Sequence, residues 1–254
     1  MHLLRTAPLR YLSLLLACWL AIFLATRGLL LASHWQEAGG FAPSVFIVGL
    51  LYDLGFLAYA ALPLGLYLLL CPPSLWQRRG HRLMLGLLLL TSLFAMLFVA
   101  TAEWLFWDEF GVRFNFIAVD YLVYSDEVLN NLLESYPLGL LLSGLGGLAA
   151  LLVLALRAPL SKALLAPLPS GRARGLGIAG LLLMAGLSLL LLDQDSPRGL
   201  GGNAYRHELA SNGPYQFFAA FRNNELDYRQ FYTTLPDAQI APLVSHRRVF
   251  PCLF

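Results

Sequence analysis

Five long apolar segments, separated by short polar stretches, dominate the hydrophobic pattern of the chain. A helix that crosses the hydrocarbon core of a bilayer, about 30 Å thick, needs about 20 mainly apolar residues. The segments that meet this requirement are residues 11–31, 48–70, 83–107, 138–156 and 175–192. Because backbone amides in hydrocarbon must be hydrogen-bonded within their own segment, all five are predicted to be helices. We expect an all-α membrane protein with five transmembrane helices in residues 1–192 and an external tail in residues 193–254.

Two further helices are predicted outside these spans. Apolar positions recur at helical spacing over Ile117–Leu133, with acidic residues on another face, which predicts an amphipathic helix on the outer surface. Its acidic character gives no attraction to anionic lipid, so docking against protein is favoured. In the tail, polar residues followed by Pro214 predict that a short helix begins near Gly213.

Composition narrows the class of protein further. Hydrophobic residues make up 58% of the chain and charged residues 13%, whereas soluble domains have about 45–50% and about 25%. This argues against a soluble globular enzyme and against a disordered chain. No block of Lys and Arg is dense enough to indicate a nucleic-acid partner. Cys18, Cys71 and Cys252 provide neither a metal-binding spacing nor an even disulfide framework.

The distribution of basic residues predicts the orientation of the chain. Nine of them lie before the first span or in the second and fourth connections: Arg5, Arg10, Arg78, Arg79, Arg82, Arg157, Lys162, Arg172 and Arg174. The opposite connections contain only Arg113. Because cytoplasmic loops carry the excess of Lys and Arg, we expect a cytoplasmic N-terminus and a periplasmic C-terminus in a bacterial inner membrane.

Three ionisable residues, Arg27, Asp53 and Glu103, lie within spans and towards the outer leaflet. An unpaired charge in the middle of a membrane costs about 2.5–3.5 kcal/mol or more, so such groups pair or face a polar cavity. We therefore expect an outer-leaflet polar cluster in which Arg27 and Asp53 neutralise each other. The alternative is that Arg27 and Glu103 extend along the helix surface to the lipid head-groups.

Aromatic residues are concentrated in the predicted amphipathic helix and in the tail. Their density in segments too short for a core of their own suggests that they pack on something larger. The residues of this candidate docking surface are Tyr121, Tyr124, Phe217, Phe218, Phe221, Tyr228 and Phe231. The alternative is that the tail rings rest at the membrane interface.

Residue patterns typical of catalysis are missing from the sequence. The five His form no pair at metal-ligand spacing, and neither a nucleophile elbow, a phosphate-binding loop nor a dinucleotide fingerprint occurs. We therefore assign no catalytic, cofactor-binding or metal-binding residue.

Two blocks of sequence resemble a known family. The first is EWLFWDEFGVRFNFIAVDYLVY, from Glu103 to Tyr124. The second comprises ELASNGPY from Glu208 and FFAAFRNNELDY from Phe217. Both are similar to the membrane half and linker of lipoteichoic-acid-synthase-like phosphoglycerol transferases of the sulfatase superfamily. The similarity extends over roughly residues 9–236.

The resemblance implies a five-helix anchor followed by an external α/β catalytic domain. In that family the domain holds Mn²⁺ or Mg²⁺ beside a Thr nucleophile and transfers phosphoglycerol from lipid to a glycan or polymer acceptor. This sequence stops at Phe254, where that domain would begin, so we expect a truncated chain that is inactive by itself. Thr233 and Thr234 fall in the linker and are not the nucleophile.

Two other functions remain open at this stage. The chain could be a complete small membrane protein that docks a separately encoded enzyme, or a carrier. A carrier is disfavoured, since carriers have charged residues at mid-depth in broken helices that recur as internal repeats. In this chain the charges lie towards one surface. The expected partners are the lipid bilayer, with anionic phospholipid as a candidate, and a catalytic domain in the same or another chain.

Overall fold

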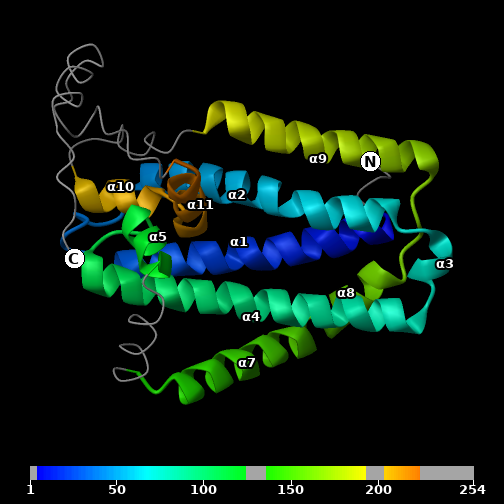
Figure 1. Ribbon diagram of the computed structural model, residues 1–254, viewed down its shortest axis with the longest axis horizontal. Coiled ribbons are helices and arrows are strands. Elements are labelled where there is room, and N and C mark those ends of the chain that lie inside the picture. The colour runs from blue at the N-terminus through cyan, green and yellow to red at the C-terminus, as the bar shows by residue number, and fades with distance from the viewer. Residues whose placement is uncertain (1–4, 124–135, 193–202, 224–254) are drawn as a thin grey trace, which may run out of the picture. The chain divides into compact units, whose positions relative to one another are not determined.

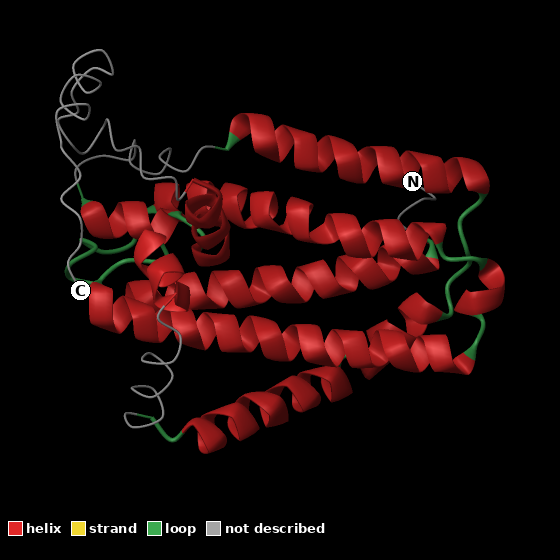
Figure 2. Cartoon of the chain, viewed as in Figure 1, coloured by secondary structure: helices red, strands yellow, loops and turns green. Residues whose placement is uncertain are grey.

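The computed structural model describes residues 5–123, 136–192 and 203–223 (Figure 1). The described part of the chain is helical and contains no strands (Figure 2). Its five long helices, each long and apolar enough to cross a membrane, are α1 (Ala7–Ser33), α2 (Pro43–Leu70), α4 (Arg79–Phe110), α7 (Leu138–Ala155) and α9 (Gly171–Leu191). The five predicted spans and the all-α class are therefore confirmed, and four of the five helices begin earlier than the apolar pattern indicates.

Short helices lie at the two ends of the long ones. Near one end, called here the α3 end, are α3 (Pro73–Trp76) and α8 (Arg157–Leu164). Near the opposite end, the α10 end, are α5 (Phe116–Val123), α10 (Ala204–Ala210) and α11 (Gly213–Asn223). Helix α5 coincides with the first half of the predicted amphipathic helix, and α11 begins where the polar and proline signal placed it. The rest of the predicted amphipathic helix lies outside the described residues.

Helices α1, α2 and α4 form the centre of the bundle. Helix α9 packs on α2, and α7 packs on α4 (Figure 1). Leucines such as Leu15, Leu68 and Leu89 fill the main apolar core between the central helices. All contacts described below lie within residues 1–221, which form one compact unit.

The ends of the helices follow from local sequence. Helix α2 begins at Pro43, where the missing backbone N–H removes no helical hydrogen bond. Helix α4 ends at Gly111, which adopts a φ of 67° while its N–H donates to the Trp107 carbonyl at 2.8 Å. Glycine tolerates this left-handed conformation without a steric cost, so the chain can turn at this point toward Arg113.

Hydrogen bonds between distant segments hold the α3 end together. The Ala7 N–H donates to the Pro167 carbonyl at 3.0 Å, and Trp76 Nε1 donates to the Leu164 carbonyl at 3.1 Å. Arg174 Nη1 donates to the Leu69 carbonyl at 2.9 Å. The start of α1, the α2–α4 connection and the α7–α9 connection therefore meet at one end. The nine basic residues that predict the orientation lie in these three segments or in the adjoining first turns of α4 and α9.

Candidate functional site: a buried charge cluster

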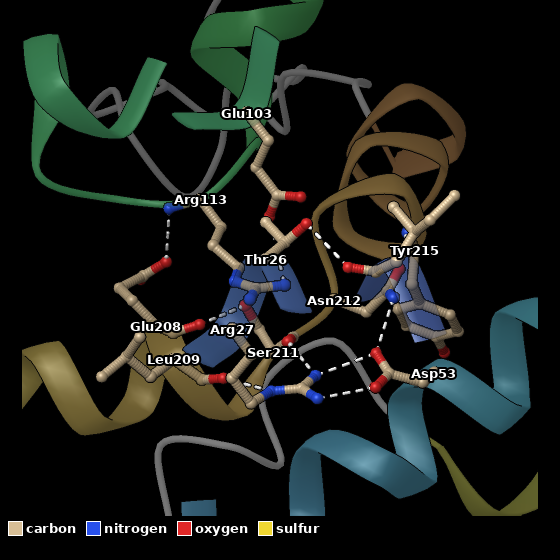
Figure 3. Close-up of polar contacts among 11 residues, drawn as sticks. Thr26, Arg27, Asp53, Glu103, Arg113, Glu208, Leu209, Ser211, Asn212 and Tyr215 are labelled. Carbon is tan, nitrogen blue, oxygen red and sulfur yellow. Dashed lines mark hydrogen bonds and ion pairs between the residues drawn. The ribbon is translucent and has the colours of Figure 1, made fainter. Parts of the chain in front are cut away.

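Four charged side chains are buried together near the α10 end (Figure 3). Arg27 comes from α1, Asp53 from α2 and Glu103 from α4, and Arg113 lies in the turn after α4. Each of the four residues is at most 1% exposed. We refer to these four residues as the charge cluster. Arg113 was not predicted to belong to it.

Arg27 and Asp53 form a two-pronged ion pair between α1 and α2. Arg27 Nη1 donates to Asp53 Oδ2 at 2.6 Å, and Nη2 donates to Oδ1 at 2.8 Å. The planar guanidinium matches a carboxylate in this geometry, which is the strongest arrangement for such a pair. The predicted pairing is therefore present. The alternative expected Arg27 to extend along the helix surface to the lipid head-groups. Instead, its side chain is fully covered by protein.

Further hydrogen bonds to this pair come from the end of α10 and from the two residues that join it to α11. Arg27 Nε donates to the Leu209 carbonyl at 2.8 Å, and Nη2 donates to the Ser211 carbonyl at 3.1 Å. Asn212 Nδ2 donates to Asp53 Oδ1 at 2.8 Å. The ion pair is thus closed by backbone and side-chain groups that lie about 160 to 180 residues away in the sequence. These bonds fix residues 209–212 to the transmembrane helices α1 and α2.

Asn212 has a second function at the start of α11. Its Oδ1 accepts a hydrogen bond from the Tyr215 N–H at 2.9 Å, which satisfies one of the free amides of the first helical turn. The Tyr215 ring packs edge-on against Tyr52, and its hydroxyl donates to the Leu192 carbonyl at 3.1 Å. A single side chain therefore caps α11 and attaches it to Asp53.

Glu103 and Arg113 form the second ion pair of the cluster. Arg113 Nη1 lies 3.1 Å from Glu103 Oε1, and the Arg113 N–H donates to Glu208 Oε2 at 3.0 Å. Burial lowers the pKa of Arg113, and the neighbouring Glu103 carboxylate opposes that shift. A Cβ atom at Gly213 would lie only 2.9 Å from Glu103 Oε2, so the first turn of α11 sits directly on this carboxylate.

Helix α10 is held by a separate set of bonds to the turn between α1 and α2. Arg206 Nε donates to the Ala38 carbonyl at 2.8 Å, and its Nη2 donates to the Gly39 carbonyl at 3.0 Å. Asn203 Nδ2 donates to the Glu37 carbonyl at 2.9 Å. The segment from Asn203 to Tyr215 is therefore attached to the bundle by two sets of bonds, one at the charge cluster and one at the turn between α1 and α2.

The structure places four of the seven residues of the candidate docking surface. Phe218 and Phe221 are 61% and 62% exposed, and Tyr121 is 41% exposed. Phe217 is partly buried, with its ring centroid 6.3 Å from that of Phe114. Tyr124, Tyr228 and Phe231 lie outside the described residues.

The arrangement is suited to holding segments together. Both arginines of the charge cluster lie within ion-pair distance of its carboxylates, so the buried charges offset one another. Within the described ranges, no group of three His, Cys, Asp or Glu residues is placed to hold a metal ion. No protein-family model, curated protein or solved structure matches the chain.

Proposed function

We propose that the chain is the membrane anchor of a cell-envelope phosphoglycerol transferase of the sulfatase superfamily. In this proposal the N-terminus is cytoplasmic, and the tail positions a metal-dependent catalytic domain at the outer face of a bacterial inner membrane. That domain would move phosphoglycerol from a membrane lipid to a glycan or polymer acceptor.

The attachment of the tail by the charge cluster carries this proposal. Five membrane helices need no external segment to cross a bilayer, yet the junction of α10 and α11 completes the hydrogen bonding of a fully buried Arg27–Asp53 pair. Removing one member of such a pair costs about 3–5 kcal/mol, because the other charge is left buried and unpaired. The segment from Leu209 to Asn212 is thus held in a defined place relative to the helices, as a mount for a domain requires.

A fixed mount favours chemistry on a membrane lipid for a simple physical reason. When a catalytic site is confined to the membrane surface that holds its lipid substrate, the effective concentration of the lipid at the site rises. A defined orientation adds to this effect because less rotational freedom is lost when the reacting groups meet. The sequence blocks from Glu103 to Tyr124 and from Glu208 to Tyr215 include the cluster residues Glu103 and Arg113 and the cap Asn212. The segments that resemble the family therefore contribute to the mount, together with Arg27 of α1 and Asp53 of α2.

A docking partner for a separately encoded enzyme is the second candidate function. The exposure of Phe116 and Tyr121 on α5 favours it, since large exposed rings are frequent in interaction surfaces. In this version the catalytic domain belongs to another chain, and α5 offers it a docking surface.

Purification from native membranes tests both versions. The chain carries an N-terminal affinity tag at its own locus, is extracted in mild detergent and is analysed by intact-mass and peptide mass spectrometry. The first version predicts a polypeptide well above 28.1 kDa that includes a phosphoglycerol-transferase domain. The second predicts a chain of 28.1 kDa bound to a separate protein with that domain.

Transfer of radiolabelled glycerol phosphate from phosphatidylglycerol, measured in the same membranes, is the functional readout. We expect deletion of the locus to abolish a transfer activity that the wild-type locus restores. The Asp53→Asn variant tests the part played by the charge cluster, since it keeps the shape of the side chain but removes its charge, and we expect it to reduce transfer. Purification without a transferase domain, together with unchanged transfer after deletion, would refute the proposal.

A further inference from the structure

Aromatic rings form a continuous series of contacts from α2 across α11 to α4. Phe218 of α11 lies against Phe56 of α2 with 6.4 Å between ring centroids, and Phe217 is 5.5 Å from Phe218. Phe217 in turn lies 6.3 Å from Phe114, which is 5.3 Å from Phe106 of α4. Helix α11 therefore joins an apolar surface that continues on the transmembrane helices.

Helix α9 provides a measure of depth along α2. Its apolar part, residues 175–192, has a length of roughly 27 Å, which is close to the thickness of the hydrocarbon core. Its C-terminal end lies beside Gly55, where an added Cβ would meet Leu192 and would be 2.9 Å from Ser188 Oγ. With α9 crossing the bilayer, the hydrocarbon boundary at the α10 end lies near Gly55.

Helix α11 contacts α2 at this level. Tyr215 packs on Tyr52 with 5.2 Å between ring centroids, and Phe218 packs on Phe56, so the contacts lie on both sides of Gly55. Leu192, at the end of α9, packs against the same apolar cluster as Tyr215 and Ala219 of α11. Helices that lie in a membrane interface bury their apolar face by about 5–10 Å. Figure 1 shows α11 running across α2 rather than along it, as a helix in the plane of the interface would.

We infer that α11 is an interfacial helix whose exposed rings, Phe218 and Phe221, contact the acyl chains of phospholipids in the leaflet at the α10 end. Its opposite face, with Ala219 and Ala220, is buried in the protein. A protein partner that covered Phe218 would have to lie at the level of Gly55, where the acyl chains border the protein. The charge cluster then fixes α11 at this depth. This inference requires α9 to cross the bilayer, and it does not depend on the proposed anchor function.

Spin-label accessibility in vesicles tests this inference. Cys18, Cys71 and Cys252 are replaced by Ala, and a nitroxide is attached at Phe218→Cys or Phe221→Cys. The full chain is reconstituted into phosphatidylcholine–phosphatidylglycerol vesicles. Collision rates with oxygen, which concentrates in hydrocarbon, and with a water-soluble nickel chelate are measured by power saturation. Phe98→Cys on the exposed face of α4 is the hydrocarbon reference, and Phe41→Cys in the α1–α2 turn is the aqueous reference.

We expect the ratio of oxygen to nickel collisions at both α11 positions to be severalfold higher than at Phe41→Cys and to approach the ratio at Phe98→Cys. Phe218→Cys removes the ring contacts with Phe56 and Phe217, so the exposed Phe221 position checks that α11 keeps its place. A ratio equal to that of Phe41→Cys would place α11 in water and overturn the inference. Low collision rates with both reagents would show that a protein surface or a second copy covers α11, which would also overturn it.

Discussion

Gly49 of α2 lies directly against the guanidinium of Arg27. A Cβ atom at this position would come within 2.6 Å of Arg27 Nη2, so only glycine leaves room for the side chain to reach Asp53. Arg27 is one of the largest fully buried side chains in the described part of the chain. The cluster therefore depends on a small residue as well as on charged ones.

Replacement of Gly49 by Ala is expected to destabilise the protein. The added methyl group forces the Arg27 guanidinium away from Asp53, and overpacking of this kind costs about 1–3 kcal/mol. Gly28→Ala in α1 is the matched control, since a Cβ there meets nothing within 4 Å. In a helix this control substitution is expected to stabilise by about 0.5–1 kcal/mol. Thermal unfolding in detergent measures both, and equal melting temperatures for the two variants would contradict the expectation.

Arg27→Gln and Asp53→Asn are expected to show strong coupling in a double-mutant cycle. Each single substitution leaves its partner buried with an uncompensated charge, which costs about 3–5 kcal/mol. The double variant has no such charge, so its loss of stability should be smaller than the sum of the two single losses. Unfolding by denaturing detergent gives the three free energies. Additive losses would mean that the two groups do not act as a pair.

The membrane helices and one ion pair could be predicted from the sequence for related reasons. Hydrocarbon imposes a minimum length on an apolar helix, and it penalises a lone charge. The length requirement identified the five spans. The penalty for a lone charge identified Arg27 and Asp53 as partners, since their charges are opposite and their predicted depths are similar. The predicted first residues of the helices were less accurate, since four of the five helices begin earlier than predicted. Polar residues such as Arg79 and Arg172 continue the helix beyond the apolar stretch, and hydropathy does not register them.

Arg113 and Asn212 could not be assigned to the cluster from the sequence. Arg113 follows a helix end and counts only as a loop charge until the turn at Gly111 directs it back toward Glu103. Asn212 has the pattern of a helix cap, and that role is present. Its second bond, to Asp53, joins residues 159 positions apart, and local patterns carry no information about such a distance.

Two substitutions of Asn212 are expected to separate its two roles. Asn212→Ser keeps an oxygen that can cap α11 but removes the donor to Asp53, whereas Asn212→Ala removes both. We expect Asn212→Ser to weaken attachment of the tail and Asn212→Ala to weaken it further, by about 0.5–2 kcal/mol for the lost cap. Limited proteolysis within residues 203–223 of the reconstituted protein reports this attachment. Cleavage at the wild-type rate in both variants would show that the other bonds hold the tail without Asn212.

A matched pair of exposed glutamines tests the orientation on which the proposed anchor depends. Gln36 lies in the turn between α1 and α2 near the α10 end, and Gln77 follows α3 at the opposite end. Since the nine basic residues belong to segments at the α3 end, we expect that end to be cytoplasmic. In a chain without its three native cysteines, a membrane-impermeant maleimide added to intact spheroplasts should label Gln36→Cys. It should label Gln77→Cys only after permeabilisation. The reverse result would place α10 and α11 in the cytoplasm, where a domain mounted on them could not reach lipid head-groups of the outer leaflet.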